Sequence, residues 1–128
     1  MIGYALVGSN DLEKAKAFYE AVLAPLGASP AFDHPSGGRV YTTGPDRPMF
    51  GVVAPFNGEA ATIGNGTMIS FAAPSQEQVR QVFAKAIELG GANEGEPGWR
   101  GDPGGFYGAY FRDLDGNKLC VYRIGPED

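Results

Sequence analysis

The side chains best suited to chemistry in this chain are one histidine, one cysteine and a pair of aspartates. His34 stands in a turn next to Pro35, where a lone histidine is more often a solvated loop residue than a ligand. Its reference pKa near neutrality would still suit acid–base work in a cleft. Cys120 is either a reactive thiol or a small core residue, and a buried apolar thiol is usually inert. The roles of both residues stay open at this point.

The two aspartates, Asp113 and Asp115, come just before Gly116 and invite comparison with a calcium-binding loop. The spacing fails, because the glycine comes too early and no glutamate occupies the twelfth position. Asp-Gly is instead a strong hairpin signal, so we interpret both aspartates as turn residues. The chain also lacks a P-loop, a Rossmann glycine pattern and a Gly-x-Ser-x-Gly motif.

Composition bounds the classes of function. The chain has 128 residues, which indicates one domain, and a formal net charge of −5. An acidic chain argues against a nucleic-acid backbone or an anionic membrane as partner, and no stretch approaches the length of a membrane span. A single cysteine fits a reducing compartment, and the segment 1–5 lacks the features of a signal peptide. We therefore expect a cytoplasmic protein.

The elements that must position these residues form a repeated pattern. A strand at 4–8 leads through the possible N-caps Ser9-Asn10-Asp11 into an amphipathic helix near 11–23, and glycine follows. The same order returns 64 residues later, with a strand from Thr67 and a helix near 75–89 that begins at Ser75. Weaker strands are expected at 31–34, 39–43 and 49–54. Further strands are expected at 92–96, 106–112 and 119–124, with Trp99 in a Gly-rich loop. The pattern predicts an α+β fold of two βαβββ modules, 1–57 and 65–126, whose sheets meet across a cleft.

Five motifs spread over nearly the whole chain are shared with one known family. They are Ser9-Asn10-Asp11-Leu12-Glu13, Phe18-Tyr19, Leu23-Ala24-Pro25-Leu26-Gly27, Gly64-Asn65-Gly66-Thr67 and Asp113-Leu114-Asp115-Gly116-Asn117-Lys118-Leu119. On these motifs the chain resembles the vicinal oxygen chelate superfamily, which includes glyoxalase I, extradiol dioxygenases, fosfomycin-resistance enzymes and bleomycin-resistance proteins. The resemblance implies the fold and leaves the reaction open, because this fold hosts several chemistries and some proteins that only bind ligands.

The resemblance also implies three positions for metal ligands. Metal-binding members commonly place histidines on the first strand and on the strand after Gly-Asn-Gly-Thr, and a glutamate on the last strand. This chain has Tyr4, Met68 and Cys120 there. A phenol, a thioether and one thiol do not form the ligand set of a divalent metal, and a soft metal on a lone Met–Cys pair has little support. We expect the three residues to converge on one cleft that binds no divalent metal.

The presumed cleft is aromatic and apolar. Strand alternation places six residues on one face, namely Tyr4, Leu6, Met68, Ser70, Cys120 and Tyr122. The resemblance adds Tyr110, because dioxygenase relatives carry a cleft tyrosine ten residues before the final glutamate. The Gly-rich segment that leads to the strand at 106–112 adds a possible lid over the cleft, which contains Trp99, Arg100, Phe106 and Tyr107. For any one of these aromatic residues, a place in the hydrophobic core explains its presence about as well as a place in the cleft wall.

Three hypotheses follow. The first is a metal-free protein that binds a small organic molecule, with Tyr4, Met68, Ser70, Trp99, Tyr107, Tyr110, Cys120 and Tyr122 at its site. The second is a lyase, isomerase or dioxygenase that uses a divalent metal ion on other ligands. The third is an interaction module whose cleft is filled by its own side chains. Because members of the resembled family are often dimers, we also expect a homodimer.

Overall fold

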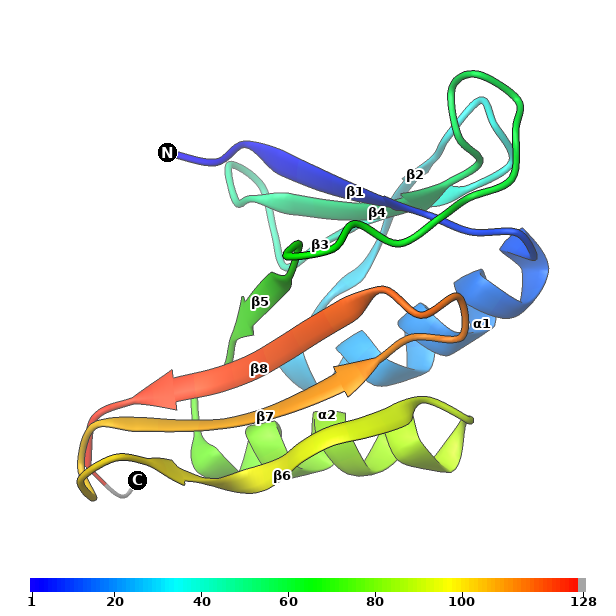
Figure 1. Ribbon diagram of the computed structural model, residues 1–128. Helices are drawn as coiled ribbons and strands as arrows, with labels where there is room; N and C mark the ends of the chain where they lie inside the picture. The colour runs from blue at the N-terminus through cyan, green and yellow to red at the C-terminus, as the bar shows by residue number, and fades with distance from the viewer. Residues whose placement is uncertain (127–128) are drawn as a thin grey trace.

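The computed structural model describes residues 1–126 as two four-stranded β-sheets and two α-helices (Figure 1). The first half of the chain contains β1 (Tyr4–Gly8), α1 (Leu12–Leu23), a 3₁₀ turn η1 (Ala24–Leu26), β2 (Ser29–Asp33), β3 (Arg39–Thr42) and β4 (Met49–Val53). The second half contains β5 (Ile69–Ala72), α2 (Gln76–Glu88), β6 (Ala92–Arg100), β7 (Phe106–Arg112) and β8 (Lys118–Ile124).

Both sheets have the same topology. The strand order is β1-β4-β3-β2 in the first sheet and β5-β8-β7-β6 in the second. In each sheet the first strand pairs in parallel with the last strand, and the remaining pairs are antiparallel. The predicted α+β fold with two βαβββ units is therefore confirmed.

The helices begin where the sequence indicates. The Asp11 carboxylate accepts a hydrogen bond from the Lys14 amide at 3.2 Å at the start of α1, and the Ser75 hydroxyl accepts one from the Gln78 amide at 3.2 Å at the start of α2. After α1 the η1 turn ends at Gly27, whose φ of 81° lies in the left-handed region that glycine adopts at little cost.

The two helices lie between the helix-bearing faces of the sheets. α2 packs on β6, β7 and β8, α1 packs on β2 and β4, and the two helices contact each other. One buried cluster therefore combines side chains of both halves, including Phe18, Tyr19 and Val22 of α1, Val79 and Val82 of α2, and Phe111 and Val121 of the second sheet. The opposite faces of the two sheets form part of the outer surface of the chain. Among residues 1–126, no helix is long and apolar enough to cross a membrane.

The turn between β7 and β8 fastens the two halves together. The buried carboxylate of Asp113 accepts hydrogen bonds from the Tyr19 hydroxyl of α1, from the amides of Asp115 and Asn117 at 2.9 Å each, and from the Asn117 side chain at 2.9 Å. Asn117 also donates to the carbonyl of Gly8 at 3.0 Å. The interpretation of Asp113 as a turn residue is confirmed, and the turn additionally holds α1 against the second sheet.

The strand β6 is longer than the sequence predicts. Residues 97–100 were expected in a loop, but they continue the strand and pair with β7, with Trp99 opposite Tyr107. Pro97 and two glycines, Gly95 and Gly98, are tolerated because β6 is an edge strand whose register is irregular near both glycines. The Gly-rich lid is therefore reduced to the hairpin connection at 101–105.

Candidate functional site

Three of the predicted site residues lie side by side on the outer face of the second sheet. Ser70 of β5 is in register with Cys120 of β8, and Cys120 is in register with Tyr110 of β7. Their neighbours in sequence, Leu119 and Val121, are fully buried on the helix side, which places the three residues on the opposite face. A row of hydroxyl and thiol groups therefore runs across three adjacent strands.

Cys120 is the middle residue of this row, between Ser70 and Tyr110, and only 1% of its surface is exposed. Burial raises the pKa of the Cys120 thiol, although hydrogen bonds with Ser70 and Tyr110 and the charges of Arg100 and Lys118 act in the opposite direction. A protonated, covered thiol is a poor nucleophile, so the surroundings favour the inert interpretation.

Two stacked aromatic rings continue the face beside the row. Phe106 and Tyr122 lie with ring centroids 5.2 Å apart and planes inclined by 10°. Gly108 makes this possible, because a Cβ atom there would lie 2.4 Å from the Phe106 ring. The face thus carries a pair of aromatic rings beside which an aromatic ligand can pack.

Two cations lie over the ring of Tyr110. The Arg100 guanidinium carbon is 5.4 Å and the Lys118 Nζ is 5.8 Å from the ring centroid. Arg100 comes from β6 and Lys118 from β8, the strands on either side of β7. Sequence reasoning missed Lys118, although alternation from Cys120 places it on the same face.

A cavity of about 720 Å³ adjoins this face, between the first sheet and β5. Met68, Ser70 and Tyr122, three of the predicted site residues, line it together with other side chains of both halves. The remaining lining is mainly apolar and comes from the N-terminal segment, the β3–β4 hairpin and the end of α1, including Ile2, Leu23, Leu26, Phe50 and Arg47. The size is typical of sites for small organic molecules.

Trp99 and Tyr107 lie on the other face of the second sheet, so the expected lid is wrong for these two residues. Tyr107 is 8% exposed and accepts a hydrogen bond from Arg80 of α2 at 3.2 Å. Trp99 packs edge-on against it, with ring centroids 5.4 Å apart. Both rings belong to the contact between sheet and helix, because pairing of 97–100 with β7 fixes which side they occupy.

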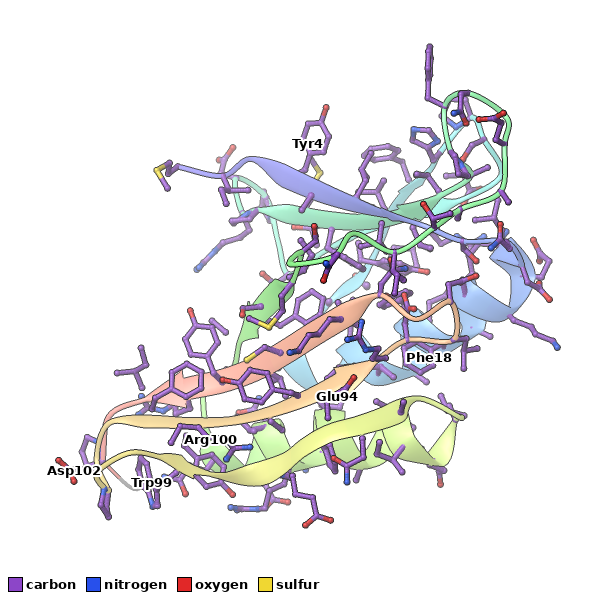
Figure 2. The ribbon with its side chains drawn as sticks, in the orientation of Figure 1. Tyr4, Phe18, Glu94, Trp99, Arg100 and Asp102 are labelled. Carbon is purple, nitrogen blue, oxygen red and sulfur yellow. The ribbon has the colours of Figure 1, made fainter. Side chains whose placement is uncertain are left out.

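Tyr4 does not join Met68 and Cys120 within one chain, so the expected convergence of the three is wrong. Tyr4 and Leu6 lie on the outer face of the first sheet, where Leu6 and Val40 close over Gly51. Tyr4 points away from the second sheet (Figure 2) and is 63% exposed. The reason is the packing of α1 and α2 between the sheets, which turns the two outer faces away from each other.

The residues at the three family metal positions do not fit a divalent metal. Tyr4 is exposed on the first sheet, Met68 is exposed just before β5, and burial raises the pKa of the Cys120 thiol. Within residues 1–126 there is no group of three His, Cys, Asp or Glu side chains placed to hold a metal ion. His34 is bound inside the β2–β3 turn, where its Nδ1 is 2.9 Å from the Ser36 hydroxyl.

Comparison with known proteins identifies the family. The model of the Glyoxalase/Bleomycin resistance protein/Dioxygenase superfamily matches residues 1–121, and the chain belongs to that superfamily. A glyoxalase/bleomycin resistance protein from Albidiferax ferrireducens T118 has a similar solved structure, with 42% identity, a TM-score of 0.87, and coverage of 96% of this chain and 98% of that one.

Other solved structures are more distant. The hypothetical protein SA1046 from S. aureus is 27% identical, with a TM-score of 0.69 over 97% of this chain and 96% of that one. A lactoylglutathione lyase from Agrobacterium tumefaciens is 22% identical, with a TM-score of 0.66 over 96% and 92%, and shares the fold alone. No curated protein matches the chain.

Proposed function

We propose that this protein binds a small organic molecule without the help of a metal ion. The site comprises the cavity and the adjoining outer face of the second sheet, which we call the Tyr110 face and define as Ser70, Phe106, Tyr110, Cys120 and Tyr122. The observation that carries the proposal is the cavity of about 720 Å³, mainly apolar and bordered by Met68, Ser70 and Tyr122. Its size matches sites that enclose small ligands, and its border supplies a few hydroxyl groups that can orient one.

Metal-free binding is proposed on the chemistry of the side chains. A phenol, a thioether and a protonated thiol stand at the positions where metal-binding relatives have harder ligands. Cytoplasmic location is part of the same proposal, because the one cysteine is a buried thiol that suits a reducing compartment.

The proposal is tested with a thermal-shift screen of aromatic metabolites and antibiotics in the presence of a chelator. A ligand that binds the native state raises the melting temperature, by an amount that grows with its concentration relative to Kd. We expect hits whose effect is unchanged by the chelator. Hits that appear only after zinc, nickel or iron(II) is added would support the metal-dependent enzyme instead.

We further propose a homodimer, because large apolar side chains cover the outer face of the first sheet. Tyr4, Leu6 and Phe32 are 63%, 40% and 50% exposed on this face. Exposed apolar patches of this kind are typical of interaction surfaces. A second copy that covers this patch is also the partner able to bring a Tyr4 side chain to the Tyr110 face of its neighbour.

Substitution of Leu6→Lys is expected to convert the dimer to a monomer, because a charge would be buried without a partner in the interface. Light scattering at micromolar concentration measures the mass of both proteins. Leu89→Lys is the matched control, since Leu89 is also 40% exposed but lies at the end of α2, and it should remain dimeric. A monomeric parent protein, or equal dissociation of both variants, would contradict the proposed interface.

A further inference from the structure

Among residues 1–126 of this acidic protein, some Lys and Arg side chains form salt bridges with carboxylates, and others do not. Six of its ten Lys and Arg side chains form salt bridges within residues 1–126, namely Lys14, Lys16, Arg39, Arg80, Lys85 and Arg112. Arg47, Arg100 and Lys118 have no carboxylate within salt-bridge distance in that part of the chain.

All three of these cations lie at the proposed site. Arg47 lines the cavity, and Arg100 and Lys118 lie over the Tyr110 ring. Figure 2 shows Arg100 and Glu94 on the strand β6. Glu94 is the neighbouring carboxylate, but it is bound by Arg112 at 2.6 Å, and the hydrogen bond from Arg112 is the main cause that lowers the pKa of Glu94. The charge of Lys118 also lowers the pKa of Glu94, but a single carboxylate that Arg112 already binds offsets only part of the positive charge around Tyr110.

The Arg100 guanidinium uses only part of its hydrogen-bond donors within the protein. It donates to the carbonyls of Gly98 at 3.0 Å and Glu96 at 2.7 Å. A guanidinium carries five N–H donors in a fixed plane, so these two bonds fix its orientation and leave others for a ligand. Lys118 is half-buried beside the same ring, which reduces the screening of its charge by water.

We infer that the ligand of this site is an aromatic organic anion whose negative group binds between Arg100 and Lys118 beside Tyr110. This inference rests on the proposed function and narrows it. The stacked rings of Phe106 and Tyr122 supply an aromatic contact for the body of the ligand, and the cavity edge at Ser70 accommodates the remainder. A cationic ligand is disfavoured, since it would meet two positive charges at the same ring.

The test is a panel of aromatic compounds in matched sets, each consisting of a carboxylic acid, its primary amide and the corresponding amine. Thermal shift in chelator finds the sets that bind, and calorimetry measures Kd for each member. We expect the acids to bind about tenfold more tightly than the amides, which is about 1.4 kcal/mol. The advantage should shrink at high salt, whereas the affinity of the amides should not change.

Two variants and a control assign the effect to residues. Arg100→Gln and Lys118→Gln should each remove most of the preference for the acid, measured as the ratio of the Kd of the amide to the Kd of the acid. Lys14→Gln makes the same charge change at an exposed position of α1 and should preserve the preference.

The outcomes separate the two proposals. If amides or amines bind as tightly as acids, or if Arg100→Gln and Lys118→Gln both retain the preference, the anion inference is wrong and the proposed function stands. If no member of any set raises the melting temperature, the proposed function fails and the inference fails with it.

Discussion

Replacement of Asp113 by alanine is expected to lower the free energy of unfolding by about 3–5 kcal/mol. The substitution removes the acceptor of four hydrogen bonds and leaves the Tyr19 hydroxyl, on a fully buried side chain, without its partner. A domain of this kind has about 5–15 kcal/mol of stability in total, so the loss is a large fraction. Urea denaturation followed by circular dichroism measures it.

Neighbouring substitutions show whether the carboxylate is responsible. Tyr19→Phe removes one of the four bonds and should cost about 1–2 kcal/mol. Asp115→Ala, two residues away, removes the carboxylate that accepts a hydrogen bond from the amide of Asn10 at an exposed site, and it should cost less than about 1 kcal/mol. If Asp113→Ala were no more destabilising than Asp115→Ala, the turn would not fasten the two halves.

Substitution of Ser70 by tryptophan is expected to weaken ligand binding by at least about a hundredfold, or about 2.7 kcal/mol. Ser70 is exposed, lines the cavity and begins the row that continues through Cys120 and Tyr110. An indole there fills space that the ligand needs. Stability should change by less than about 0.5 kcal/mol, since the position is exposed and tryptophan is favourable in strands.

The measurement is calorimetry with a compound found by the screen. Gln81→Trp is the matched control, because it adds the same side chain at an exposed position of α2, away from the cavity lining. It should bind like the parent. Unchanged binding by Ser70→Trp, or an equal loss in Gln81→Trp, would show that the ligand does not use this cavity edge.

Much of the fold could be predicted because its signals are local. The N-caps Asp11 and Ser75, the buried stripes of both helices and the glycines that follow them appear in the structure within a residue of the expected bounds. Caps, helical periodicity and turns depend on residues only a few positions apart. The end of β6 was missed because Pro97 and the adjacent glycines indicate a loop, and only pairing with β7 makes these residues a strand.

The site was less predictable, because it depends on how whole elements pack. Alternation correctly placed Ser70, Cys120 and Tyr122 on one face of the second sheet, since register follows from neighbouring strands. Nothing local determines that α1 and α2 pack between the two sheets, and this packing separates Tyr4 from Cys120. The position of Trp99 likewise followed from the unexpected length of β6.

The most direct test of metal-free ligand binding is a calorimetric titration of the chelator-treated, metal-analysed protein with a compound from the screen. The account predicts saturable binding by protein that contains no stoichiometric metal, with a Kd that does not change when zinc, nickel or iron(II) is added back. Absence of binding by the metal-stripped protein, followed by its appearance with one equivalent of a divalent metal, would contradict the account and favour a metal-dependent enzyme.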